Sequence, residues 1–114
     1  MKKEVNLRQF QEEILNNWGL SVVQFYSRWS NTAEVMNEVF GELANMFSKD
    51  IKFYSLNVDT EPILKSEFGI KVLPKLVIFR YGEVIDEVSG FIAGNQLYGC
   101  LIAKLQMAMA VIYN

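Results

Sequence analysis

Apolar residues in the first quarter of the chain follow helical spacing and then strand spacing. Residues 21–26 (SVVQFY) are rich in β-formers and apolar on both sides of the pleat except at Gln24, which is typical of a central strand covered on both faces. The preceding positions recur every three or four residues up to a stop at Gly19: Leu7, Phe10, Ile14, Leu15 and Trp18. The pattern predicts a helix followed by a central strand.

The middle of the chain repeats this alternation. Asn31 followed by Glu34 resembles a capping box at the start of a long helix. The apolar stripe of that helix is Val35, Met36, Val39, Phe40, Leu43, Met46 and Phe47. Residues 51–58 (IKFYSLNV) then form the next predicted strand, and a short helix is expected over residues 61–68 with Thr60 as its N-cap.

The last third of the chain predicts a hairpin and a helix. Residues 75–80 (KLVIFR) and 83–88 (EVIDEV) are β-rich runs separated only by Tyr81-Gly82, which indicates an antiparallel pair. After Gly94-Asn95 a helix of about 25 Å is expected from apolar residues at every fourth position. These are Leu97, Leu101, Leu105 and Met109.

The order of elements predicts an α/β fold. A strand, a helix and a parallel strand must connect with a right-handed crossover, so helices are expected on both faces of the sheet. The hairpin makes the sheet mixed, and Val5 could add a short edge strand. We therefore predict one domain over residues 1–114, a three-layer α/β/α sandwich with a central sheet of four to five strands.

Composition removes several classes of function. About half of the 114 residues are apolar, enough for one core, and a net charge of −2 with scattered Lys and Arg gives no case for binding nucleic acid. No apolar run approaches the roughly 20 residues of a membrane span. The charged N-terminus lacks the apolar segment of a secretory signal, so we expect a cytoplasmic protein.

The chain also lacks common catalytic side chains. It has no histidine, and its one cysteine is Cys100, which excludes histidine-based catalysis, the usual Cys/His zinc sites and an intramolecular disulfide. Asp50, Asp59 and Asp86 lie at element ends and are interpreted as caps or solvated charges. We expect no metal and no cofactor. Cys100 is expected to pack, inert, at the margin of the core.

The ordered motifs resemble thioredoxin from about residue 5 to residue 105. The matching segments correspond to the strand leading into the active-site tryptophan, the end of the next strand, the region of the cis-proline, the hairpin turn and the approach to the last helix. They are 22–29 (VVQFYSRW), 56–59 (LNVD), 69–79 (GIKVLPKLVIF), 81–84 (YGEV), Gly90 and Gln96-Leu97. The resemblance implies a thioredoxin fold with a cis peptide before Pro74.

The same resemblance indicates that the redox chemistry is absent. Thioredoxins carry Trp-Cys-Gly-Pro-Cys at the start of the second helix, whereas residues 29–33 here read Trp-Ser-Asn-Thr-Ala. Ser30 is too weakly acidic to replace the thiolate, and Ala33 cannot resolve a mixed disulfide. Gln24 and Ser55 match the family's buried Asp and Lys. We therefore expect no catalytic residue, with Ser30 and Ala33 as degenerate active-site positions.

Ser30 has a second interpretation as a nucleophile. Such a serine needs an adjacent general base, and without histidine that base would have to be Lys71 or Lys75. A role for Ser30 as helix N-cap is the favoured alternative.

The resemblance further implies a groove that binds extended peptide beside the tryptophan and the cis-proline. The residues expected to line it are Trp29, Ser30, Asn31, Thr32, Leu73, Pro74, Lys75 and Phe91. The alternative is that these side chains only pack locally. A further candidate surface is the tail at residues 106–113, which is apolar almost all round; a homodimer contact is the first choice, packing on the sheet the second and reversible membrane contact the third.

Two functional hypotheses follow. The first is a redox-inactive thioredoxin-like domain that binds a protein or peptide partner through the Trp29/Pro74 surface, through the apolar tail, or both. The second is a divergent thioredoxin in cell redox homeostasis that uses Cys100 or a cysteine of its partner.

Overall fold

The sheet of the protein has five strands in the order β1-β3-β2-β4-β5. The computed structural model describes residues 2–16, 19–29, 33–47, 49–89 and 94–113. β1, β3 and β2 are parallel, and β4 and β5 continue the sheet antiparallel. The strand bounds are β1 Lys2–Glu4, β2 Leu20–Tyr26, β3 Ile51–Asn57, β4 Lys75–Arg80 and β5 Glu83–Ser89.

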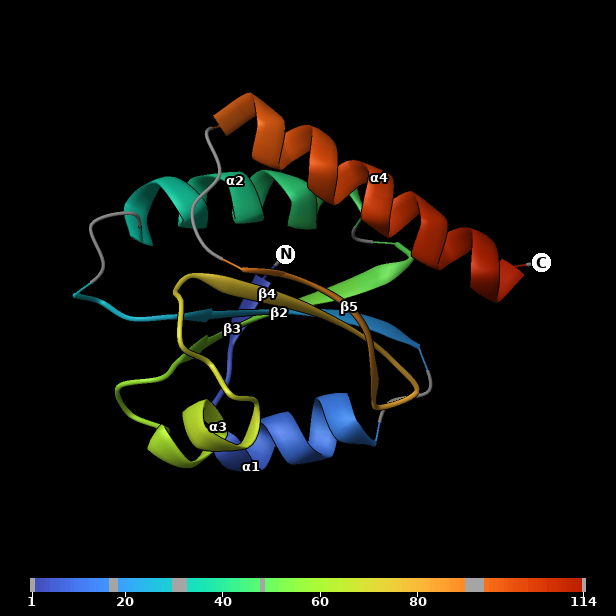
Figure 1. Ribbon diagram of the computed structural model, residues 1–114. Helices are drawn as coiled ribbons and strands as arrows, with labels where there is room; N and C mark the ends of the chain where they lie inside the picture. The colour runs from blue at the N-terminus through green and yellow to red at the C-terminus, as the bar shows by residue number, and fades with distance from the viewer. Residues whose placement is uncertain (1, 17–18, 30–32, 48, 90–93, 114) are drawn as a thin grey trace.

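Helices cover both faces of this sheet. α2 and α4 lie on one face, while α1 and α3 lie on the other (Figure 1). Their bounds are α1 Leu7–Phe10, continued by the π-helix η1 Gln11–Leu15, α2 Ala33–Met46, α3 Pro62–Glu67 and α4 Gly94–Tyr113. The predicted three-layer sandwich with a mixed sheet is confirmed.

Two apolar clusters fill the spaces between the layers. On the α2/α4 face, Phe40 packs edge-on against Phe53 at a ring separation of 5.4 Å. On the α1/α3 face, Phe10 makes edge contacts with Phe68 and Phe79. All seven residues of β2 are buried because the strand separates the two clusters.

Local details differ from the predictions. The first helix changes to a π turn after Phe10, which leaves both Phe10 and Ile14 fully buried. Thr60 is not the N-cap of α3: its hydroxyl donates to the carbonyl of Asn57 at 3.0 Å. The N-cap position belongs to Glu61, whose carboxylate accepts from the Leu7 N–H at 3.1 Å and so ties α3 to α1.

The edge strand also lies earlier than expected. β1 covers Lys2–Glu4, and Val5 follows it as a buried residue whose N–H donates to the carbonyl of Ser55 at 2.8 Å. A three-residue strand is too short for a periodicity to reveal it.

α4 is longer than its predicted 25 Å, since 20 residues correspond to about 30 Å. Ala108 is buried, and Met109 packs against the α2/α4 cluster, so this part of the tail packs on the sheet. Met107 is 71% exposed. The predicted homodimer contact stays a prediction. Among the described helices, none has the length and apolarity to cross a membrane.

The β4–β5 turn depends on a close backbone approach. Tyr81 and Gly82 both have positive φ, 53° and 79°, as a type I′ two-residue hairpin requires. A Cβ atom at Gly82 would overlap the backbone carbonyl of Leu15 at the end of η1. The turn is therefore fitted to the α1–η1 layer and not only to its own strands.

We predict that Gly82→Ala lowers the free energy of unfolding by about 2 kcal/mol or more, because the variant combines a strained φ with a backbone overlap. Gly41→Ala is the matched control. Gly41 lies inside α2 with nothing within 4 Å of the added methyl, so this variant should gain about 0.5–1 kcal/mol. Urea unfolding measures both, and a Gly82→Ala variant as stable as the parent would contradict the packing of the turn.

Candidate functional site

Three loops meet at one end of the sheet. β2 and β3 run parallel and end in register at Tyr26 and Asn57, while β4 starts beside them with Lys75 opposite Phe25. The segments after β2, after β3 and before β4 therefore converge here. We call this end the carboxyl edge.

Exposed apolar side chains gather in these segments. Trp29 is 87% exposed, and Val72 is 54% exposed. Leu73 is half-buried, Pro74 is buried, and the peptide bond between them is cis. Ile63, in the first turn of α3, is 61% exposed. Large apolar side chains left this open at the ends of strands are candidates for binding a partner.

The loop that carries Trp29 is anchored by Asp59. One carboxylate oxygen of Asp59 accepts from the Ser27 hydroxyl at 2.8 Å and from the Arg28 N–H at 3.3 Å. The Ser27 oxygen in turn accepts from the Trp29 N–H at 3.2 Å. Asp59 is exposed and accepts a backbone N–H, as expected of a cap or solvated charge, and these bonds in addition hold the Trp29 loop against the end of β3.

Lys75 contributes to the carboxyl edge mainly through its backbone. Its ammonium group forms an ion pair with Glu87 at 3.3 Å and donates to the carbonyl of Phe68 at 3.4 Å. The side chain is buried at the α3 face. These contacts commit Lys75 to β5 and α3, which disfavours it as a base for Ser30.

The core beneath the edge contains a neutral polar pair. Gln24 and Ser55 are both buried, and the Ser55 hydroxyl donates to the Gln24 side-chain oxygen at a long 3.5 Å. The Gln24 amide nitrogen has no hydrogen-bond partner among the described residues. Neither side chain titrates near neutral pH, so this pair cannot take up or release a proton in a reaction.

Tyr26, at the end of β2, is linked to the sheet edge. Its hydroxyl donates to the carboxylate of Glu4 at 2.7 Å. Burial, reinforced by the bond to Glu4 and its negative charge, raises the pKa of Tyr26 to about 12. Burial likewise raises the pKa of Tyr54 on β3. Both tyrosines therefore stay protonated well above neutral pH.

Part of the predicted site lies outside the described residues, namely Ser30, Asn31, Thr32 and Phe91. Ala33 is the first residue of α2. Cys100 is half-buried in α4 and packs against the α2/α4 cluster, at the margin of the core as predicted. Within the searched residues, no three potential metal ligands come together.

Trp29, Leu73 and Pro74, which the resemblance implies line one groove, lie in segments that meet at the carboxyl edge, and their role in binding stays a prediction. Ile63 and the anchoring role of Asp59 were not predicted. Val72 belongs to the recognised segment 69–79 and was not singled out. The sequence does contain a signal for the position of Ile63. This residue follows Pro62 at the start of the short predicted helix, close to the end of the preceding strand.

Comparison with known proteins gives one consistent result. The family model described as Thioredoxin matches residues 1–103. The thioredoxin of Pyropia yezoensis is 31% identical over 98 residues, which cover 86% of this chain and 92% of that protein. Thioredoxin 2 of Chlorobaculum tepidum is 30% identical over 94 residues, covering 82% and 86% of the two chains.

We predict that Gln24→Met raises the free energy of unfolding by about 1 kcal/mol, because a buried amide without a partner costs about 1–3 kcal/mol. Ser55→Ala is the matched variant: it removes the donor to Gln24 and should lower stability by about 1 kcal/mol. Chemical denaturation measures both. A clear loss of stability in Gln24→Met would show that the amide is satisfied, for example by a buried water.

A second prediction concerns alkaline pH. Unfolded tyrosine ionises near pH 10, whereas burial, and after it the bond to Glu4, raises the pKa of folded Tyr26 to about 12. The stability linked to this shift is therefore complete below pH 10 and is lost as the pH rises towards 12. The loss should be on the order of 2 kcal/mol. Tyr26→Phe should unfold more easily at pH 8, by about 1 kcal/mol, but lose less stability between pH 10 and 12. If the free energy of unfolding of the parent and of Tyr26→Phe fell equally between pH 10 and 12, Tyr26 would not be the group responsible.

Proposed function

The chain belongs to the thioredoxin family, and from this premise we propose that it binds an extended segment of a protein partner at the carboxyl edge without a dithiol of its own. The observation that carries the proposal is Trp29, which is 87% exposed and whose loop is nevertheless fixed by hydrogen bonds. A large aromatic side chain presented on an ordered loop loses little conformational entropy when a partner covers it.

The neighbouring segments support an extended peptide as the ligand. Val72 and Leu73 precede β4, and their apolar side chains lie on the segment that enters the same edge as the Trp29 loop. An extended peptide can use backbone groups of such a segment and place alternate side chains on apolar contacts. Ile63 would extend the apolar contact towards α3.

The single cysteine of the sequence supports a proposal without the usual dithiol reaction cycle. Reduction of a disulfide by one protein requires a thiolate that attacks and a second thiol that resolves the mixed disulfide. This chain contains one cysteine, Cys100, in α4. The neutral Gln24–Ser55 pair beneath the edge supplies no proton acceptor either.

A second candidate function is a redox role in thiol homeostasis, and the names of the relatives favour it, since each of those described above is a thioredoxin. In this case the Cys100 thiolate would attack a partner disulfide, forming a mixed disulfide while the other partner sulfur leaves as a thiolate. An external thiol reductant would then attack the Cys100 sulfur of the mixed disulfide, so that the partner leaves reduced, and a second reductant thiol would free Cys100 and leave the reductant as a disulfide. The half-buried position of Cys100 requires a partner that reaches α4.

The binding proposal is tested by affinity capture with the parent and a Trp29→Ala, Leu73→Ala double variant. We expect at least a tenfold loss of captured partner, since buried tryptophan anchors are typical hot spots. Val84→Ala is the control, because Val84 is 46% exposed on the hairpin of β4 and β5, away from the carboxyl edge. Equal capture by the double variant would remove the carboxyl edge as the binding surface.

The redox candidate is separated by an insulin reduction assay with dithiothreitol as electron donor. The binding proposal predicts no turnover above the reagent alone, for the parent and for Cys100→Ala. Turnover by the parent that is lost in Cys100→Ala would establish the redox role instead. Turnover that persists both in Cys100→Ala and in the Trp29→Ala, Leu73→Ala double variant would contradict both candidates.

A further inference from the structure

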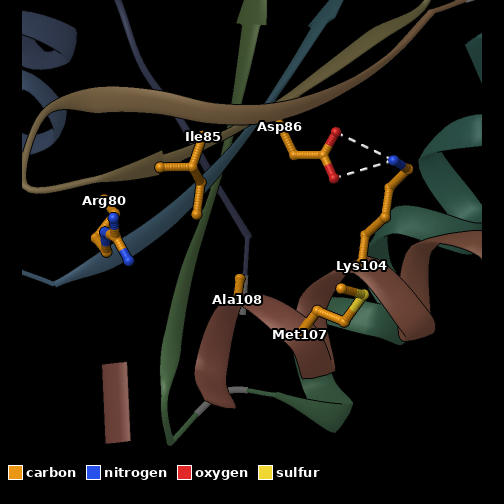
Figure 2. Close-up of a pocket in the computed structure, with 6 residues that line it drawn as sticks. All are labelled: Arg80, Ile85, Asp86, Lys104, Met107 and Ala108. Carbon is orange, nitrogen blue, oxygen red and sulfur yellow. Dashed lines mark hydrogen bonds and ion pairs between the residues drawn. The ribbon is translucent and has the colours of Figure 1, made fainter. Parts of the chain in front are cut away.

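A pocket lies between the β4–β5 hairpin and the C-terminal half of α4, away from the carboxyl edge. Its volume is about 240 Å³. Figure 2 shows Ile85 pointing from the hairpin towards the helix, with Arg80 on one side of it and the Asp86–Lys104 pair on the other. The lining residues are Arg80, Ile85 and Asp86 from the hairpin and Lys104, Met107 and Ala108 from α4.

A β-bulge creates the hairpin wall of this pocket. Ile78 pairs with Asp86, but the next residue of β4, Phe79, pairs with Val84, which leaves Ile85 without a partner. A bulge of this kind turns two successive side chains towards the same face of a sheet. Ile85 and Asp86 consequently both line the pocket, one apolar and one charged.

The charges around the pocket do not cancel. The Lys104 ammonium group lies 3.0 Å from each carboxylate oxygen of Asp86, and this hydrogen bonding raises the pKa of Lys104. Arg80 forms no ion pair with any described residue, although Glu83 is its register partner across the hairpin. Among the described residues, the lining therefore carries one positive charge, that of Arg80, outside any ion pair, in a protein of net charge −2.

The other walls are apolar. Met107 is 71% exposed, Ile85 is 36% exposed and Ala108 is buried at the base. The pocket volume is about 240 Å³. This is small for a drug-sized molecule but sufficient for a short chain with one polar group.

We propose that this pocket binds a small monocarboxylate with an apolar body, such as a medium-chain fatty acid. The carboxylate pairs with the guanidinium of Arg80, a geometry that two parallel N–H donors favour. The apolar body lies against Ile85, Met107 and Ala108. The site is separate from the carboxyl edge, so its test is independent of the proposed function.

The test is a titration of the ¹⁵N-labelled protein with octanoate below its micellar concentration, followed by NMR. Octanoate should shift the signals of Ile85, Met107 and Ala108 and bind at least fivefold more tightly than acetate or 1-octanol. Acetate lacks the apolar body and octanol lacks the carboxylate. Equal affinity for octanol, or shifts confined to other parts of the protein, would overturn the proposal.

Variants distinguish specific binding of octanoate at Arg80 from non-specific binding of an amphiphile to apolar surface. Arg80→Gln should weaken octanoate at least fivefold and leave octanol unchanged. Glu83→Gln should strengthen octanoate about twofold, because it removes the acid nearest in register to Arg80. Arg8→Gln is the control, since Arg8 lies on the opposite layer in an exposed pair with Glu12. Unchanged octanoate affinity in Arg80→Gln and Glu83→Gln, both checked for folding by thermal unfolding, would overturn the assignment.

Discussion

Complete burial of β2 is the constraint on which the rest of the structure depends. The strand lies between β3 and β4 and between the two helical layers. Four of its seven buried side chains join the apolar clusters, Leu20 and Val22 on the α2/α4 face and Val23 and Phe25 on the α1/α3 face. Its pairing with β3 and β4 also determines which loops meet at the carboxyl edge. Trp29 owes its position to this arrangement, because it lies only three residues after the strand ends at Tyr26.

Burial of β2 also explains how much of the fold could be predicted. A strand apolar on both faces and helices with one apolar stripe are strong signals, and their order leaves few topologies once crossovers must be right-handed. Sequence signals for single positions, such as helix caps, predicted the structure less well where tertiary contacts compete with local ones. Thr60 is a good N-cap by type, yet its hydroxyl bonds back to the carbonyl of Asn57 and the N-cap position belongs to Glu61, whose carboxylate contacts Leu7 in α1.

The candidate site shows the same division. The resemblance to thioredoxin implies that Trp29, Leu73 and Pro74 lie together, and the strand ends that carry them do meet at one edge. The sequence could not show that Asp59 anchors the Trp29 loop or that Lys75 is committed to Glu87 and Phe68. These depend on side-chain directions across three elements. The bulge at Ile85 was equally hidden, since 83–88 reads as an uninterrupted strand.

The two functional candidates require different surfaces of the molecule, and this separates them physically. A peptide bound at the carboxyl edge contacts Trp29 and the segment before Pro74. Neither segment contains a cysteine. Cys100 lies six residues into α4, about 9 Å along the helix from Gly94, and packs against the core. A partner held at Trp29 would have to extend onto α4 before its disulfide met this thiol. The two candidates therefore make different demands on the partner: one requires contact with the carboxyl edge, the other requires access to α4.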